Sequence, residues 1–403
     1  MMRSMFAGVT GLRNHQIRMD VIGSNIANVN TIGFKASRVN FQEAFSQTIK
    51  GASAPSGSRG GTNPQQIGLG MTIAGVDVLH TQGNLQPTGL MTDLAIERSG
   101  FFILRDASGF SYTRAGNFDL DADGYLTATG GRRVQGWMAQ NGIFGEKNQN
   151  TLTNLRIPVG EVIGARATAN MTMANNIDAR EPVGTALVRT IDVYDSLGNS
   201  HYLVITFEKT DVNEWSWQAE WNSGVVGSGS LKFTTEGKLS AVLGDSISFT
   251  PEGANQVDIT IDFSRITQCA SGSSVAVIDR NGNSMGTLEG FTIDSSGVIT
   301  GVYSNGLTER LAQVGLASFA NPGGLMKRGE NTYEASNNSG IPQIGEAGTG
   351  GRGTVAPGAL EMSSVDLSLE FTSMIVTQRG FQANSRIITT SDEMLQELVN
   401  LKR

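Results

Sequence analysis

Glycine is distributed very unevenly along this chain. Of its 51 glycines, four lie in the first 50 residues and one lies in the last 45, so the other 46 fall between residues 51 and 358. Glycine weakens the interior of a helix but is well suited to tight turns. The distribution therefore predicts two helical ends around a long, turn-rich β region.

Apolar residues recur every three or four positions at both ends, as they do along one face of a helix. The N-terminal series is Met5, Val9, Leu12, Gln16, Met19, Gly23 and Ile26. The C-terminal series is Leu367, Phe371, Met374, Gln378, Phe381, Ser385, Ile388, Asp392, Leu395 and Val399. A helix with such a stripe needs a partner that buries it. We therefore predict that the two ends pair as a coiled coil; two separate surface helices on a globular core are the alternative.

Short β-type runs alternate with turns between about residue 71 and residue 357. Residues 121–124, 279–282 and 294–297 are typical hairpin turns between β-branched and aromatic runs. No helical pattern alternates with them, which argues against a doubly wound α/β fold. Residues 46–68 are rich in Ser, Gly, Pro, Asn and Gln and indicate an extended linker. The predicted fold class is mainly β with terminal α-helices, with an inner β domain and an outer barrel-like or sandwich-like β domain.

Composition excludes several classes of protein. Charged residues are 17% of the chain and the net charge is −7, whereas a nucleic-acid-binding protein usually carries a basic face. A single cysteine excludes a disulfide framework, and no apolar run is long enough to span a membrane. Arg3, Arg13, His15 and Arg18 interrupt the apolar stretch that a secretory signal peptide needs. The chain is therefore predicted to stay in the cytoplasm or to be exported without cleavage.

Two patterns resemble ligand-binding loops but lack a required part. Residues 119–124 begin like a calcium loop, yet its twelfth position is Gly130 instead of a glutamate. Residues 348–353 match the glycine pattern of a dinucleotide-binding loop, but Pro357 follows too soon for a helix to begin there. We interpret the first as a hairpin turn and the second as a flexible loop.

The remaining reactive residue types form no catalytic group in the sequence. The three histidines lie far apart, with no metal-ligand spacing, and Cys269 is expected to be a buried or half-buried free thiol. The aromatic residues of the middle region alternate with polar ones, which is typical of one face of a sheet, although a glycan-binding platform is an alternative. They are Tyr194, Tyr202, Trp215, Trp217 and Trp221. We predict no catalytic, cofactor-binding or metal-binding residues, and a structural or assembly protein rather than an enzyme.

Particular motifs at both ends carry a family resemblance. Residues 7–12 and 19–35, including Asn25, Ile26, Asn28, Thr31, Gly33 and Phe34, resemble the N-terminal signature of the bacterial flagellar rod and hook proteins. Residues 358–367, 374–384 and 390–395 resemble the C-terminal signature, with Ser364 where the family usually has asparagine and Phe381 where it often has tyrosine. Internal blocks containing Gly100, Phe101, Gly124 and Gly136 also match.

The resemblance implies a domain organisation. Residues 1–35 and 358–403 would form a terminal helical assembly domain, and residues 36–70 an extended linker. Residues 71–145 and 305–357 would form the inner β domain, and residues 146–304 the outer β domain. It also assigns self-assembly to residues of the terminal helices: Met5, Val9, Leu12, Met19, Asn25, Ile26, Asn28, Leu367, Phe371, Met374, Gln378, Phe381, Asn384, Ile388, Leu395 and Val399.

The insertion at residues 146–304 favours a hook protein within this family. The resemblance then implies a structural subunit of a curved, flexible tube that transmits motor torque to the filament, outside the cell and exported without a cleaved signal peptide. The expected partners are further copies of the chain, the distal rod, the hook cap, the hook–filament junction proteins and the flagellar export apparatus. Residues 41–91 also resemble the distal rod protein, so a rod protein with an outer insertion remains an alternative.

Overall fold

The computed structural model describes residues 2–55, 57 and 60–401, so residues 1, 402 and 403 of the predicted terminal ranges lie outside the described residues. The chain forms two compact units. Unit 1 comprises Met1–Ile157, Thr292–Thr300 and Arg310–Arg403, and unit 2 comprises Pro158–Phe291 and Gly301–Glu309. Strands β23 (Gly286–Ile293), β24 (Val298–Tyr303) and β25 (Thr308–Val314) carry the chain between the units.

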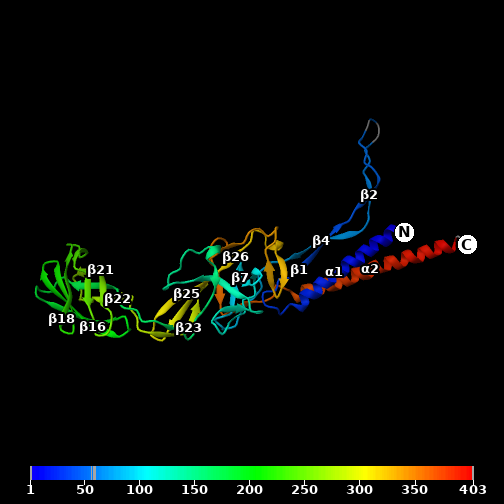
Figure 1. The fold of residues 1–403 in the computed structure, drawn as a ribbon. Helices are drawn as coiled ribbons and strands as arrows, with labels where there is room; N and C mark the ends of the chain where they lie inside the picture. The colour runs from blue at the N-terminus through cyan, green and yellow to red at the C-terminus, as the bar shows by residue number, and fades with distance from the viewer. Residues whose placement is uncertain (1, 56, 58–59, 402–403) are drawn as a thin grey trace. The chain divides into compact units, whose positions relative to one another are not determined.

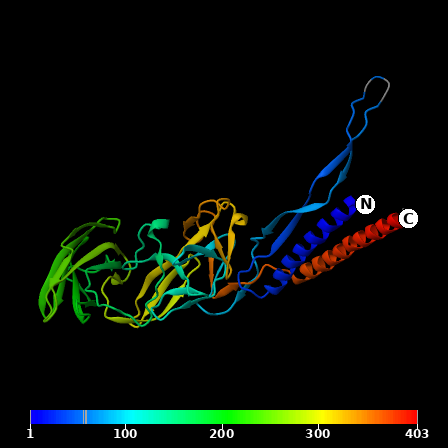
Figure 2. The same cartoon turned by 45° about the vertical axis from the view of Figure 1, so that its right-hand side comes forward.

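A long helix lies at each end of unit 1. Helix α1 spans Met2–Ala27 and α2 spans Leu367–Asn400. Asp366 caps α2, since its carboxylate accepts hydrogen bonds from the main-chain nitrogens of Ser368 (2.8 Å) and Leu369 (3.2 Å). The two helices lie side by side in both views (Figures 1 and 2). The predicted pairing of the ends and the predicted fold class are therefore confirmed.

The body of unit 1 is an antiparallel sheet in which β25, β11, β7, β8, β28 and β27 are neighbours in that order. Its aromatic core includes Phe101, Tyr112, Trp137 and Tyr333. The strands of the body are β5 (Leu85–Pro87), β6 (Leu94–Ile96), β7 (Phe101–Asp106), β8 (Gly109–Thr113), β9 (Phe118–Leu120), β10 (Leu126–Ala128), β11 (Arg133–Met138), β12 (Thr153–Asn154), β26 (Leu316–Ser318), β27 (Met326–Gly329), β28 (Thr332–Glu334), β29 (Gln343–Gly345), β30 (Val355–Pro357) and β31 (Ala359–Glu361). Two 3₁₀ turns, Gln149–Thr151 and Pro322–Gly324, complete it.

The two loop interpretations made from sequence agree with the structure. Strands β9 and β10 form an antiparallel hairpin. Asp121 lies in its turn and accepts hydrogen bonds from the main-chain nitrogens of Asp123 (3.0 Å) and Tyr125 (2.7 Å), so its carboxylate holds the turn. Residues 348–353 form a loop that leads into strand β30 and not into a helix.

The segment 36–70 differs from the expected linker, because much of it is paired β structure. Strand β1 (Ser37–Glu43) pairs with β4 (Met71–Val78), and β2 (Ser46–Lys50) pairs with β3 (Gln65–Gly68), both antiparallel. All residues of β2 and β3 are exposed. The composition was misleading here because this pairing satisfies main-chain groups and needs little apolar burial by the side chains.

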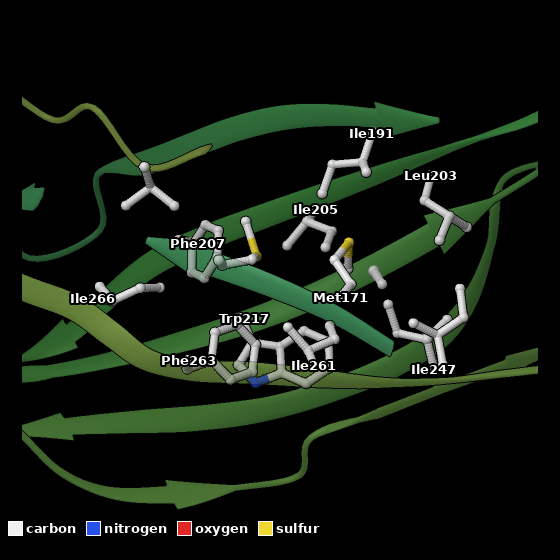
Figure 3. Packing of buried hydrophobic residues seen from close by; sticks show 14 of the residues in the cluster. Met171, Ile191, Leu203, Ile205, Phe207, Trp217, Ile247, Ile261, Phe263 and Ile266 are labelled. Carbon is white, nitrogen blue, oxygen red and sulfur yellow. The ribbon is translucent and has the colours of Figure 1, made fainter. Parts of the chain in front are cut away.

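Unit 2 is a β-sandwich. One sheet has the order β15–β16–β17–β18–β19 and the other β20–β21–β14–β22. Isoleucine, phenylalanine, methionine and tryptophan side chains fill the space between them, among them Ile205, Phe207, Trp217 and Phe263 (Figure 3). The strands are β13 (Val162–Ile163), β14 (Asn170–Asp178), β15 (Ala186–Tyr194), β16 (Ser200–Asp211), β17 (Glu214–Trp221), β18 (Gly224–Phe233), β19 (Leu239–Leu243), β20 (Ser246–Phe249), β21 (Val257–Cys269) and β22 (Ala276–Arg280).

Three residues of unit 2 test expectations that the sequence raised. The side chains of Trp215 and Trp217 are 0% and 1% exposed, so they belong to the core, as the alternating pattern of β17 predicts. They cannot form a surface platform for glycans. Cys269 is exposed because it lies at the end of β21. This corrects the expectation of a buried or half-buried thiol.

Candidate self-assembly surface on the terminal helices

Small residues let α1 and α2 approach closely. A Cβ atom added at Gly11 would lie 2.7 Å from the side chain of Asn384, and one added at Gly380 would lie 2.8 Å from the ring of His15. At Gly8 it would lie 3.1 Å from Ile388. A larger side chain at these positions would have to displace these neighbouring side chains or push the helices apart.

Polar side chains occupy much of the same seam. Ser4 and Ser391 place their hydroxyl oxygens 3.4 Å apart across it. Asn25, only 1% exposed, donates from Nδ2 to Glu370 Oε1 (2.9 Å). The same amide also donates to the main-chain oxygen of Ser37 (2.8 Å) and accepts from its nitrogen (3.0 Å), which fixes the end of α1 to β1.

The predicted apolar stripes are mostly outside this seam, which corrects the proposed way in which the helices pair. Several of their members are exposed: Leu367 39%, Phe371 50%, Phe381 38%, Val399 67% and Val9 48%, with Gln378 also exposed. Other stripe residues are half-buried: Met5, Leu12, Met19, Ile26, Met374, Ile388 and Leu395. The predicted self-assembly residues Asn28 and Asn384 are half-buried too, and Asn384 and Ile388 do face the seam, against Gly11 and Gly8. On α1 the seam runs one residue before the stripe, at positions 4, 8, 11 and 15, and one residue turns the helix by about 100°. The missed signal was the set of glycines at helical spacing.

The exposed side of α2 is unusually apolar for a soluble helix. In addition to the stripe residues, large apolar side chains are exposed at Leu369, Ile375, Val376, Ile387, Met394 and Leu398. Apolar surface of this kind along one element is typical of an interaction site.

The remaining family-motif residues have structural positions. Gly33 has φ +68° and its added Cβ would lie 2.5 Å from the main chain of Ala115, so no other residue fits there. Phe34 and Phe101 are buried, and Thr31 donates to Asn28 Oδ1 (3.1 Å). Gly100 and Gly124 adopt positive φ, and at Gly136 an added Cβ would collide with the main chain of Gln313. Ser364 accepts from the main-chain nitrogen of Ala36 (3.1 Å).

A buried cluster of charges lies where the helices meet the sheet, and nothing in the sequence analysis predicted it. The side chains of Lys35 and Glu361 are both 0% exposed and form an ion pair of 2.7 Å. Arg114, 4% exposed, places Nε 3.3 Å from the other carboxylate oxygen. Burial lowers the pKa of Lys35, and the charge of Arg114 lowers it further, while Glu361 opposes both.

His80 borders this cluster. Its ring centroid lies 5.6 Å from that of Phe101 and 5.4 Å from that of Tyr333. Burial lowers the pKa of His80 to about 4, and the charges of Lys35, Arg114 and Lys327 act in the same direction. His80 is therefore neutral at pH 7.

Comparison with known proteins identifies the family. Family models match residues 5–35 (flagella basal body rod protein), 95–175 (flagellar hook protein FlgE/F/G D1 domain), 165–283 (flagellar basal body protein FlaE D2 domain) and 356–401 (flagellar basal body rod FlgEFG protein C-terminal). The chain is 45% identical to the flagellar hook protein FlgE of Borreliella burgdorferi, over 100% of both chains. This chain belongs to the flagellar hook protein family.

Two further similarities fit this family. The flagellar basal-body rod protein FlgG of Bacillus subtilis is 33% identical over 100% of both chains. A crystal structure of the Helicobacter pylori hook protein FlgE2 shares the fold, with a TM-score of 0.53 at 16% identity, over 69% of this chain and 100% of that one. As a member of the hook family, the chain is a flagellar structural protein that assembles with copies of itself. No helix among the described residues is long and apolar enough to cross a membrane.

The glycine seam can be tested with two matched substitutions in α1. Gly11→Leu should weaken the pairing of α1 and α2 by about 1–3 kcal/mol, because the added side chain overpacks the seam. Gly23→Leu makes the same chemical change where an added Cβ meets nothing within 4 Å, and it should not weaken the pairing. Thermal unfolding of the helices in the assembled protein, followed by far-UV circular dichroism, measures both. Equal melting temperatures for the two variants would contradict a close-packed seam.

The lowered pKa of His80 predicts that the stability of unit 1 falls in acid. The pKa of His80 is about 4 in the folded protein and ordinarily 6.5, so the unfolded chain binds the proton more readily between these values. The free energy of unfolding should therefore fall as the pH falls from 6.5 to 4. In His80→Phe this loss between pH 7 and pH 4.5 should be smaller by about 1–3 kcal/mol. Urea unfolding at the two pH values checks this, and an unchanged difference would show that His80 is not responsible.

Proposed function

We propose that this chain is the structural subunit of the bacterial flagellar hook, a curved and flexible tube that transmits motor torque to the filament as a universal joint. The observation that carries the proposal is the exposed apolar surface of α2. It occurs in a chain that is 45% identical, over its whole length, to a hook protein. The seam between α1 and α2 is already filled, so the apolar side is available to neighbouring copies. Burying it would release apolar surface from water and drive assembly.

The assembly that we propose is an open-ended helical polymer. Contacts between different faces of identical subunits generate an open helical filament when the rotation between neighbours does not close into a ring. The terminal helices would line the tube, and the β units would form its outer shells, following the domain organisation expected from the sequence. The low content of charged residues, 17%, favours weakly bound β surfaces that can slide as the tube bends.

Partners and location follow from the same proposal. The chain would meet the distal rod at one end of the tube and the hook cap and hook–filament junction proteins at the other. It would pass through the flagellar export apparatus without cleavage, because charged residues such as Arg13 and Arg18 interrupt the N-terminal apolar series. Its role would be mechanical, with no cofactor and no catalysis.

A distal rod subunit with an outer insertion is the second candidate. The full-length similarity to a rod protein of Bacillus subtilis favours it. The two candidates differ in the shape of the polymer, since a hook is curved and a rod is straight.

Electron microscopy of the assembled full-length chain tests the proposal. We expect curved tubes; straight tubes would favour the rod. Chains that lack residues 1–30 or 365–403 should stay soluble with a folded β region and should form no tubes. The longer cut removes the apolar side of α2, and the shorter one removes α1, which packs against α2. Both cuts leave Gly33 and Glu361 in place, so the β body keeps its contacts with these residues. Tubes from either truncated chain would show that the helices do not drive assembly.

We also propose that the terminal helices order fully only on assembly. The buried residues of α1 include one large apolar side chain, Ile22, and those of α2 are Thr377 and Ser391, so the pair alone buries little apolar surface. Helices without such burial are marginal in water.

Circular dichroism measures this ordering. The helical signal of the full-length chain should rise when it polymerises, whereas the chain without residues 365–403 should show no rise under the same conditions. A helical signal that is the same before and after polymerisation would contradict coupled ordering.

A further inference from the structure

Glu361 connects the chain segments next to both terminal helices. It ends strand β31, shortly before α2, and its side chain is 0% exposed. Its main-chain oxygen accepts from the nitrogen of Gly33 (2.7 Å), which follows α1. Its Oε1 accepts from Lys35 Nζ (2.7 Å) and from the main-chain nitrogen of Gly83 (2.8 Å), which follows β4. Three segments that lead to α1, α2 and the β1–β4 hairpin are thus held by one residue.

The second carboxylate oxygen connects the same residue to the β body. Arg114, which directly follows β8, places Nε 3.3 Å from Glu361 Oε2. The guanidinium of Arg114 also donates to the main-chain oxygens of Ile96 (3.3 Å) and Arg98. Main-chain oxygens at the end of β6 and just after it therefore position Arg114, and its guanidinium forms an ion pair with Glu361.

Glu361 is also the carboxylate on which both buried cations depend. Among the ion pairs of the described residues, those of Lys35 and Arg114 are made with Glu361. The other acceptors around them are main-chain oxygens, such as that of Thr81 for Lys35 (2.7 Å). Removing one partner of a buried ion pair leaves an uncompensated charge that is strongly unfavourable. Loss of the Glu361 charge would leave two such cations.

We infer that Glu361 is a positioning residue that fixes the bases of both terminal helices to the sheet of unit 1. A force applied to the helices is then passed to the β body and is not absorbed by rotation at the junction. This inference deepens the proposed hook function and rests on it for its mechanical meaning. Neighbouring contacts do not need the carboxylate: the nitrogen of Ala36 donates to Ser364 Oγ (3.1 Å), and the nitrogen of Ser364 donates to the oxygen of Phe34 (3.1 Å). The junction should therefore loosen without Glu361 while the sheet stays folded.

Hydrogen exchange on the full-length chain tests the local part of the inference. In Glu361→Gln the amide of Gly83, whose acceptor is the carboxylate, should exchange at least about tenfold faster, because a local opening becomes easier. The amides of the β7–β8 hairpin should keep their rates. The matched control is Glu334→Gln, which removes the same charge from an exposed position in β28. An unchanged Gly83 rate, or equal rates in both variants, would overturn the inference.

Two further variants separate positioning from general stability. Lys35→Met in the Glu361→Gln background removes one of the two cations left unpaired, so part of the protection at Gly83 should return. If Glu361→Gln loses protection throughout unit 1, Glu361→Asp is used as the test variant in its place. Aspartate keeps the negative charge, but its shorter side chain cannot reach all the partners of Glu361. Loss of protection throughout unit 1 in Glu361→Asp as well would overturn the positioning role.

The stiffness of the assembled tube tests the mechanical part of the inference. Tubes of Glu361→Gln should form, and their persistence length in electron micrographs should be shorter than that of the wild type and of Glu334→Gln. Equal persistence lengths would overturn the mechanical role. Failure of the wild-type chain to form tubes would instead contradict the proposed function, while the exchange rate at Gly83 would still decide whether Glu361 holds the junction.

Discussion

The close approach of α1 and α2 determines which side chains the two helices leave exposed. Gly11 and Gly380 bring the helices together so tightly that small and polar groups fill the seam. Large apolar side chains such as Phe371 and Val399 are consequently left on the outside of the pair. In a globular protein this arrangement would be unfavourable, because exposed apolar surface promotes association. In the polymer that we propose, burial of the same surface would provide free energy of assembly.

Each β unit has a hydrophobic core of its own. Unit 2 has its own sandwich core, built around residues such as Trp217 and Phe263. Unit 1 has an aromatic core and, beside it, the buried charges of Lys35, Arg114 and Glu361. A buried charge cluster stabilises one specific arrangement, since each charged group needs its partners in place. The molecule therefore combines general apolar packing inside the units with specific polar contacts at the junction.

Sequence reasoning identified the elements better than it identified their contacts. The glycine distribution predicted terminal helices and a β middle, because turn and helix preferences act locally. The turn at Asp121 and the alternating burial of Trp215 and Trp217 were also predictable from local patterns. The helix seam was assigned to the wrong face, because apolar periodicity shows which side seeks burial but not whether the partner is in the same chain. The β2–β3 pair and the Glu361 cluster were missed, because main-chain pairing and contacts between residues 35, 114 and 361 leave no local signal.

The exposed thiol of Cys269 has a practical consequence. It belongs to the one cysteine of the chain, and its main-chain nitrogen is held by Asn176 Oδ1 at 2.7 Å. A maleimide dye would therefore attach at a single, structurally fixed site on unit 2 of each subunit, without any substitution. Energy transfer between dyes on neighbouring subunits could then report how their spacing changes as a tube bends.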